Sequence, residues 1–447
     1  MAASLGARLG GTVRDLRRLS GGASRITSAF DLEVAGHPPR ALILQVERGR
    51  GLSEGKTRIE RDLLERAAAT GVPVPRVVAM GESDEIGSAW LVVERLSGET
   101  IPRKILRDEE WAGARAVLAT QCGAALAAVH AIDPDSIGDL PAADPLGDPL
   151  AFLDALGAVR PALELGVRWL DAHRPEPGRP VTVHGDFRCG NLLVGPEGLR
   201  GVLDWELAHV GDAAEDLGWL CAPAWRFGGP GEVGGFGAVD ELLAAYHAAG
   251  GPAVEPERVH WWQVYATVKW ATICALQASS HLTGATRSVE LATIGRRVCE
   301  SEWDLFALLG VAPTEWPESE PDAGTASTPA SAPFGRPTAA ELVEAVREYI
   351  ESTMEEASGS ARFEARVARN ALAIVERELA SGPAIAQAHA ARLGALGFAD
   401  DAALAAAIRA GTCDREWRRV GAALAASARD QLRVANPGYV AAGGGAA

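Results

Sequence analysis

Three polar side chains near the middle of the chain have the types and spacing that phosphoryl transfer needs. The stretch VTVHGDFRCGNLLV, residues 181–194, holds Asp186 and Asn191 between two runs of β-forming residues, and Asp204 follows in GVLDWE. Phosphoryl transfer requires a carboxylate near the acceptor hydroxyl and oxygen ligands for the Mg²⁺ that bridges the nucleotide phosphates. We expect Asp186 to face that hydroxyl, and Asn191 and Asp204 to hold the metal from two sides.

The same residues also have purely structural interpretations. Polar residues that end strands and form turns would show the same types. His184 fits a hydrogen-bonded core histidine better than a general base, because a carboxylate two residues later is better placed for that role. Cys189 fits a small packing residue, since no base stands beside it. Glu206 could bind the metal or simply end a strand, whereas Asp212 and Asp216 fit helix capping and loop bracing better than metal binding.

Hydrophobic periodicity divides the chain into the elements that must position these residues. Residues 19–96 contain several strand patterns and one helical pattern, whereas residues 97–312 are mainly helical around the central strand–loop–strand. Residues 313–336 are rich in Pro, Ser, Thr, Ala and Asp and predict a disordered or extended linker. Residues 337–434 predict an α-helical accessory domain, and residues 435–447 a flexible tail.

Composition excludes several classes of protein. The chain has 447 residues, enough for two or three domains, and a formal charge of −16, which argues against a nucleic-acid partner. No apolar run has the length of a membrane span, and the N-terminus lacks the pattern of a signal peptide. The six cysteines show no metal-binding spacing. We therefore expect a cytoplasmic protein that neither spans nor binds a membrane.

The motif HGDxxxxN, followed by DWE, resembles that of the aminoglycoside phosphotransferase and choline kinase family, which shares the protein-kinase-like fold. The resemblance extends to LSGGAS, TGVPVPRV, VVERLSGE and GDAAEDLGWL and covers about residues 15–310. It implies an α+β, bilobal fold with a small β-rich N-terminal lobe (residues 1–96) that binds nucleotide and a mainly helical C-terminal lobe (residues 97–312). The helical segment after the linker resembles an uncharacterised domain found in some bacterial members.

The resemblance also implies roles for individual residues. Asp186 would be the catalytic base, with His184 and Arg188 in the same catalytic set, and Asn191 and Asp204 would be the metal ligands. The nucleotide would be held by residues of the N-terminal lobe: Gly21, Gly22 and Ser24 over the phosphates, Glu60 as the partner of a basic anchor, Gln45 at that anchor's position, and Val93, Glu94 and Leu96 at the hinge that meets the adenine.

Gln45 departs from the pattern of the family. Many relatives carry Arg or Lys at this position, whereas glutamine supplies no charge against phosphate. Arg48, Arg25 or Lys56 could substitute for it, and the sequence does not choose among them. Gln45 therefore leaves open a second class of function, a nucleotide-binding regulatory or scaffolding protein without significant turnover.

The expected activity is an ATP-dependent (or other NTP-dependent), Mg²⁺-dependent transfer of the γ-phosphate to the hydroxyl of a small molecule. A metabolic acceptor, such as a hydroxyacyl thioester, an amino alcohol or a sugar, is favoured over an aminoglycoside. The C-terminal helices show no catalytic cluster. We expect them to pack against the kinase-like lobe or to mediate self-association as a homodimer.

Overall fold

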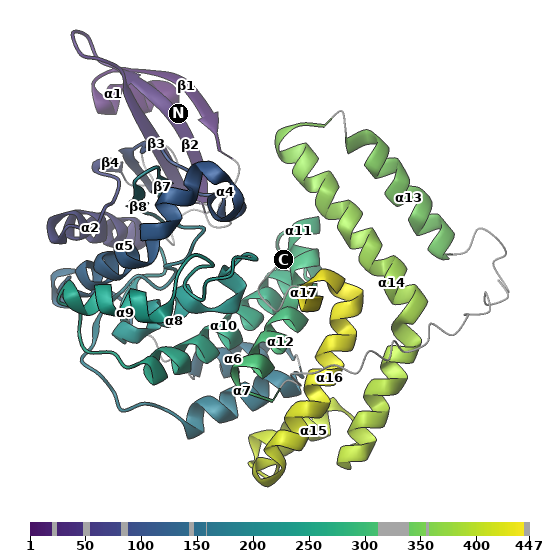
Figure 1. Ribbon diagram of the computed structural model, residues 1–447. Helices are drawn as coiled ribbons and strands as arrows, with labels where there is room; N and C mark the ends of the chain where they lie inside the picture. Colours follow the sequence, from purple (N-terminus) through teal and green to yellow (C-terminus); the bar gives the residue numbers. More distant parts are fainter. Residues whose placement is uncertain are drawn as a thin grey trace. The chain divides into compact units, whose positions relative to one another are not determined.

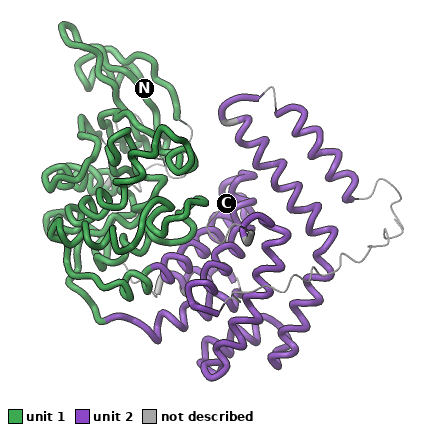
Figure 2. The backbone as a smooth tube through the Cα atoms, in the orientation of Figure 1, with its two compact units in different colours: residues 1–143, 176–262 green, residues 144–175, 263–447 purple. Residues whose placement is uncertain are grey.

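The computed structural model describes residues 1–19, 25–47, 54–81, 88–142, 147–157, 159–311, 339–354 and 357–441. Gly21, Gly22, Ser24 and Arg48 lie outside these ranges. The chain forms two compact units, which Figure 2 shows in green and purple. Unit 1 contains Met1–Ala143 and Glu176–Trp262, and unit 2 contains Asp144–Pro175 and Gln263–Ala447.

Unit 1 begins with an antiparallel sheet of five strands in the order β1-β2-β3-β5-β4. The elements are α1 (Ala2–Leu9), β1 (Thr12–Arg18), β2 (Arg25–Glu33), β3 (Arg40–Glu47), α2 (Glu54–Thr70), β4 (Val77–Gly81) and β5 (Trp90–Glu94) (Figure 1). The expected strands and the single helix of this region are therefore present, and the expected stop of that helix coincides with Gly71 at φ 91°. Helix α1 was not expected from the sequence.

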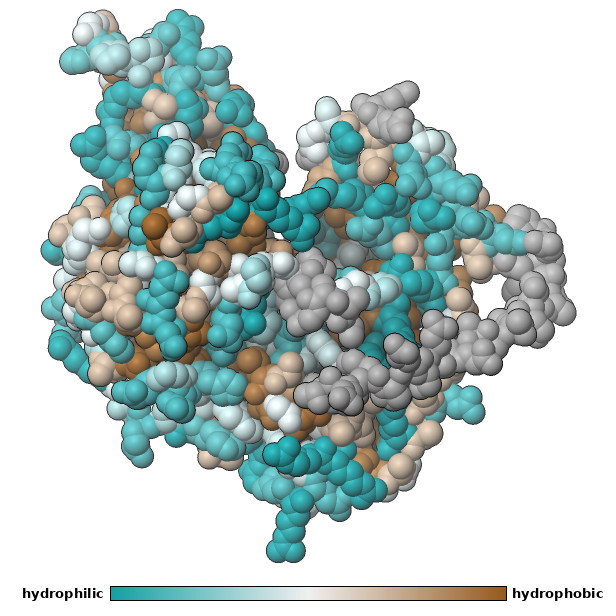
Figure 3. All heavy atoms as spheres, viewed as in Figure 1, coloured by the Kyte–Doolittle hydropathy of each residue, from teal (hydrophilic) through white to brown (hydrophobic). Residues whose placement is uncertain are grey.

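Alternation along β3 gives this sheet two different faces. Leu42, Leu44 and Val46 are buried in a hydrophobic cluster that also contains Phe30 of β2 and Leu5 of α1. The intervening residues of β3 face the other way. The edge strand β1 carries mostly exposed, charged residues, and hydrophilic side chains cover this end of unit 1 in Figure 3. Charge on an edge strand discourages pairing with another chain.

The rest of unit 1 is mainly helical. It contains α4 (Pro102–Arg107), α5 (Ala112–His130), β6 (Val181–Val183), β7 (Leu192–Gly195), β8 (Gly198–Val202), β9 (His209–Gly211), α8 (Ala213–Cys221), α9 (Val239–Ala248) and the first turns of α10 (Pro256–Leu282). Strands β7 and β8 form an antiparallel hairpin, and β6 pairs with β9. The bilobal, kinase-like α+β fold expected from the sequence is confirmed.

Helix α5 is the central helix of this region. In the described part of the chain, one stretch, Glu109–His130, is long and apolar enough to cross a membrane by length and composition, and 50% of its apolar 18-residue window is buried inside the fold. Helix α5 packs against α9 and β8. The approach to α9 is so close that a Cβ atom at Gly123 would lie 2.5 Å from the carbonyl oxygen of Leu242. These contacts are those of a core helix.

Unit 2 is built from helices that come from both sides of the expected linker. They are α6 (Gly147–Leu156), α7 (Pro161–Ala172), the remainder of α10, α11 (Val289–Ile294), α12 (Val298–Leu308), α13 (Ala339–Met354), α14 (Gly359–Leu396), α15 (Asp401–Arg409), α16 (Trp417–Ala435) and α17 (Pro437–Ala441). Leu165 of α7 and Phe306 of α12 share one buried cluster with Leu404 of α15 and Leu424 of α16.

Ion pairs reinforce this shared core. Arg409 of α15 pairs with Glu164 of α7 and, at 3.0 Å, with Asp154 of α6. Arg168 of α7 pairs with Asp414 at 2.7 Å. The helices of residues 337–434 and those of residues 144–175 and 263–311 therefore form one folded unit, although the composition of residues 313–336 predicts a domain boundary between them.

The expected flexible tail needs correction at its start. Residues Pro437–Ala441 form helix α17, and Tyr439 is 3% exposed. The Tyr439 hydroxyl donates a hydrogen bond of 2.7 Å to Asp304 of α12. In this position the apolar ring is buried and the polar hydroxyl is hydrogen-bonded. Both contacts explain why the chain stays ordered beyond residue 435.

Candidate active site

The HGD segment joins β6 to the loop that carries Asp186. Gly185 has φ 80°, and a Cβ atom at this position would lie 2.3 Å from the carbonyl oxygen of Leu207, so the turn requires glycine. His184 is completely buried, and burial lowers its pKa. Its Nε2 donates to the carbonyl of Leu203 at 3.1 Å, and its Nδ1 accepts the N–H of Asp186 at 3.2 Å. His184 is therefore a neutral brace of the loop.

Three donors hold the carboxylate of Asp186. Oδ1 accepts hydrogen bonds of 2.9 Å from Arg188 Nε and from Trp219 Nε1, and Oδ2 accepts one of 2.6 Å from Asn191 Nδ2. The guanidinium of Arg188 stacks over the ring of Trp225, with its Cζ 4.7 Å from the ring centroid. Donors to both oxygens fix the direction of the carboxylate. The roles of Trp219 and Trp225 were not expected, since neither has a sequence spacing that singles it out.

The β7–β8 hairpin brings Asn191 and Asp204 to the same place. Leu192 is paired with Val202, so the residues just before β7 and just after β8 lie at the same end of the hairpin. The Leu203 N–H donates to the Asn191 carbonyl at 2.9 Å. Asn191 directs its Nδ2 at the main-chain carbonyl of Asp186 (3.0 Å) as well as at its carboxylate. Asp186, Asn191 and Asp204 thus lie in one small region.

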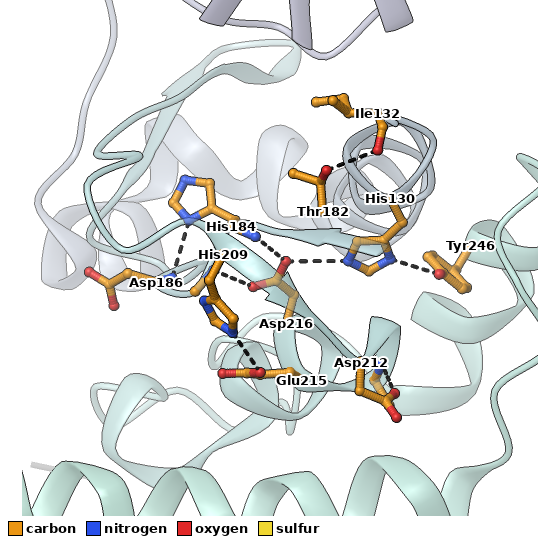
Figure 4. A network of polar contacts seen from close by, with 12 residues as sticks. His130, Ile132, Thr182, His184, Asp186, His209, Asp212, Glu215, Asp216 and Tyr246 are labelled. Carbon is orange, nitrogen blue, oxygen red and sulfur yellow. Dashed lines mark hydrogen bonds and ion pairs between the residues drawn. The ribbon is translucent and has the colours of Figure 1, made fainter. Parts of the chain in front are cut away.

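The carboxylate of Asp216, in α8, supports the start of this loop at His184 and Gly185 (Figure 4). Its Oδ2 accepts the N–H of His184 at 2.7 Å, and its Oδ1 accepts the N–H of Gly185 at 2.9 Å. His130 of α5 contacts the same carboxylate at 3.3 Å and the hydroxyl of Tyr246 at 2.7 Å. Asp212, four residues earlier, caps α8 by accepting the N–H of Ala214. The two acids therefore have the bracing and capping contacts that the sequence favours.

Asp204 has an unusual environment. Its φ of 68° lies in the left-handed region, which is rarely occupied by residues other than glycine and often marks a functional site. Burial and the neighbouring carboxylates of Glu206 and Asp186 raise the pKa of Asp204 to about 7. Such a concentration of negative charge would be relieved by a divalent cation.

The donors fit Mg²⁺ in the form that this ion usually takes in proteins. Among the described residues, no three His, Cys, Asp or Glu side chains are grouped so that they could hold a metal ion. Mg²⁺ is generally bound by one or two protein oxygens together with waters and substrate phosphates, not by a complete protein cage. The amide oxygen of Asn191 and the carboxylate of Asp204 match this requirement.

Glu60, which the sequence predicts to be the partner of a basic anchor, lies in an ion pair of the N-terminal lobe. Glu60 of α2 is 3% exposed and pairs with Arg25, the first residue of β2. Arg25 also donates its Nε to Glu47 at 2.7 Å and lies 4.0 Å from Glu206. Burial lowers the pKa of Arg25, but Glu60 and Glu47 outweigh it and raise the pKa. Gln45 is partly buried in β3, and Lys56 is exposed.

Other predicted residues have simpler positions. Glu94 ends β5, and its side chain pairs with Arg76 at 2.6 Å. Leu96 lies close to Gly201 of β8. Burial raises the pKa of Cys189 to about 12, so this thiol is a packing group and not a nucleophile.

Comparison with known proteins identifies the family. The profile of the phosphotransferase enzyme family matches residues 15–262. The chain belongs to this family. A domain of unknown function, DUF6285, matches residues 355–439 of unit 2. The phosphotransferase match thus ends at the last residue of unit 1.

Individual relatives agree with this assignment. The chain is 30% identical over 200 residues to acyl-CoA dehydrogenase family member 10 of Mus musculus, matching 41% of this chain and 18% of that protein. It is 33% identical over 174 residues to an aminoglycoside 3'-phosphotransferase of Streptomyces fradiae, matching 35% of this chain and 61% of that enzyme. These matches span less than two thirds of either relative.

A solved structure supports the fold of this phosphotransferase. A Ralstonia eutropha protein assigned to the aminoglycoside phosphotransferases superposes with a TM-score of 0.55 at 20% identity, over 69% of this chain and 98% of that one. At this identity the likeness concerns the fold.

Proposed function

We propose that this phosphotransferase moves the γ-phosphate of ATP, or of another nucleoside triphosphate, to the hydroxyl of a small molecule. The observation that carries the proposal is the grouping of Asp186, Asn191 and Asp204 by the β7–β8 hairpin. Phosphoryl transfer depends mainly on positioning and electrostatic stabilisation, and these residues supply both. The buried free cysteines accord with a reducing cytoplasm, where we place the enzyme.

Each residue has a defined task in this proposal. Asp186 accepts the hydrogen bond of the acceptor hydroxyl and takes up its proton as the new bond forms, while Arg188 and Trp219 keep the carboxylate oriented. His184 keeps Asp186 at a fixed distance from the end of β8. Asn191 and Asp204 would hold Mg²⁺, which when bound offsets charge on the transferring phosphoryl group.

For the acceptor, we propose a metabolic hydroxyl compound, with a hydroxyacyl thioester as the first candidate. The match to an acyl-CoA dehydrogenase family member supports this choice. Arg188 supports it too, because a polycationic aminoglycoside would meet a fixed positive charge beside the catalytic carboxylate. The stacked Arg188 and Trp225 would form a flat wall next to the acceptor.

A screen of hydroxylated compounds tests the proposal. The full chain is incubated with ATP and Mg²⁺ and with hydroxyacyl thioesters, amino alcohols, sugars and one aminoglycoside, and mass spectrometry detects the gain of one phosphate. We expect Asp186→Ala to lower turnover about 10²- to 10⁴-fold, and Asp133→Asn, at a surface helix cap, to leave it unchanged. Equal turnover in wild type and Asp186→Ala would refute the enzymatic role.

Gln45 favours one competing function, that of a nucleotide-binding protein without turnover. Such a protein would bind ATP but release no phosphate with any acceptor. Calorimetric titration with ATP, combined with the turnover assay, separates the two functions, because binding without turnover in the wild type would support the competing one.

A further inference from the structure

The charge that is missing at Gln45 is present on the neighbouring strand. In the register of β2 and β3, Thr27 lies opposite Gln45 and Arg25 lies opposite Glu47. Side chains two residues apart on a strand point to the same face. Arg25 therefore projects from the same face of the sheet as Gln45, one step along the ladder, and this is the face that meets Glu60 of α2.

We propose that Arg25 is the phosphate anchor of this enzyme, in place of a basic residue at position 45. The inference rests on the proposed function and adds a specific residue to it. Of the two candidate cations that the structure describes, Lys56 is exposed. Arg25 is the one that the structure buries against Glu60, within 4.0 Å of Glu206 in the DWE segment.

The guanidinium has the donors that this role needs. Arginine carries five N–H donors, and Arg25 uses Nε for Glu47 and Nη1 for Glu60. In the described part of the chain, its Nη2 makes no hydrogen bond to protein. Glu47 and Glu60 thus hold the planar group through Nε and Nη1, and the Nη2 donors are left for a phosphate. A lysine ammonium has three donors and lacks this geometry.

Electrostatics gives a second reason for the role. Glu47, Glu60 and Glu206 surround Arg25, and Asp204 lies close to Glu206. A polyphosphate brought to this region would be repelled by the carboxylates unless a cation separated them from it. Arg25 lies between the glutamates of the sheet and α2 and the segment that carries Asp204, where such a cation is needed.

Calorimetric titrations of the full chain with MgATP and with adenosine test the proposal. We expect R25Q to weaken MgATP binding about 10- to 100-fold, the loss typical of a charged hydrogen-bonded contact, and to leave adenosine binding unchanged. The double variant R25Q/Q45K should regain most of the lost affinity. R14Q is the matched control, because Arg14 makes an exposed ion pair with Glu33 on the same sheet.

The outcomes distinguish the anchor from the proposed function. A wild type that binds MgATP and turns over, with an R25Q variant of unchanged MgATP affinity, would overturn the anchor alone. Equal losses of MgATP and adenosine binding in R25Q would overturn it too, since they would indicate a structural role. A wild type that binds neither MgATP nor another magnesium nucleoside triphosphate would refute the proposed function and the anchor together.

A single added charge keeps the test decisive if R25Q fails to fold, as judged by circular dichroism. Q45K in the wild-type background should then raise MgATP affinity less than about 3-fold, because an anchor is already present. A gain of 10-fold or more would mean that the wild type lacks one, and would overturn the proposal.

Discussion

Replacing Asp216 by asparagine should destabilise unit 1 and disturb the catalytic loop at the same time. The carboxylate accepts hydrogen bonds from the main-chain N–H groups of His184 and Gly185, one on each oxygen, and contacts His130. An asparagine has a single acceptor oxygen. Whichever way the amide turns, its NH₂ group faces a main-chain N–H group, and one buried donor is left unpaired.

The loss in the free energy of unfolding can be estimated from these contacts. An unpaired buried donor costs about 1–3 kcal/mol, and the hydrogen bonds that remain lose the contribution of a charged acceptor, which is about 1 kcal/mol. We therefore expect a loss of about 3 kcal/mol in the free energy of unfolding. For a unit of this size that corresponds to a fall of about 6–12 °C in Tm.

The pH dependence of the difference in Tm between wild type and Asp216→Asn tests the same role independently. Burial raises the pKa of Asp216, but its hydrogen bonds, that to His130 first, outweigh burial and lower the pKa. The stability contributed by such a group is present above the unfolded-state pKa of about 3.9 and is lost as pH falls through the lower, folded-state value. The difference in Tm between wild type and Asp216→Asn should therefore shrink below about pH 4.

Differential scanning calorimetry of the full chain measures the effect, and Asp212→Asn is the control. Asp212 caps the same helix, where asparagine is an equally good cap, and its ion pair with Arg258 becomes a hydrogen bond to a neutral amide, so we expect a loss of only about 1 kcal/mol there. Turnover should fall in Asp216→Asn, because its loop carries Asp186. If the two variants melted at the same temperature, the bracing role of Asp216 would be refuted.

Three further predictions follow from packing and burial. Gly123→Ala should cost about 1–3 kcal/mol by overpacking α5 against α9, whereas Gly113→Ala in the same helix, where a Cβ atom meets open space, should not destabilise; chemical denaturation compares the two. Tyr439→Phe should cost about 1–2 kcal/mol by removing the hydrogen bond to Asp304, and an unchanged midpoint would mean that this hydrogen bond contributes nothing to stability. The six buried thiols should react slowly with a disulfide reagent at pH 8 and rapidly in denaturant, and a fast-reacting thiol in the native protein would contradict the burial of residues such as Cys189.

Much of the fold could be predicted because its signals are local. Alternation in ALILQVE marks β3, and helical spacing followed by Gly71 marks α2 and its end. The grouping of Asp186 and Asn191 could be predicted because both belong to one short loop. Asp204 follows once β7 and β8 are assigned as a hairpin.

The parts that were missed depend on contacts between distant segments. The division of the chain into units is set by side chains of α7 and α12 that pack on α15 and α16. The local sequence pattern of a helix does not indicate which distant helix it packs against. The burial of Tyr439 depends on Asp304 in the same way. Trp219 reaches Asp186 from the next helix, so its role appears only when α8 is placed behind the loop.

Gln45 is the main reason to doubt catalysis, and the position of Arg25 on the neighbouring strand weakens that reason. Gln45 leaves Glu60 without a cationic partner on β3, and an unpaired Glu60 would add only negative charge to the N-terminal lobe. In the structure Glu60 is paired, and the pairing cation comes from the strand next to Gln45, on the same face. If Arg25 is the phosphate anchor, as proposed above, β2 supplies the positive charge that Gln45 removes from β3. A neutral residue at position 45 then says little about turnover, because the electrostatic requirement concerns where the positive charge lies and not which strand carries it.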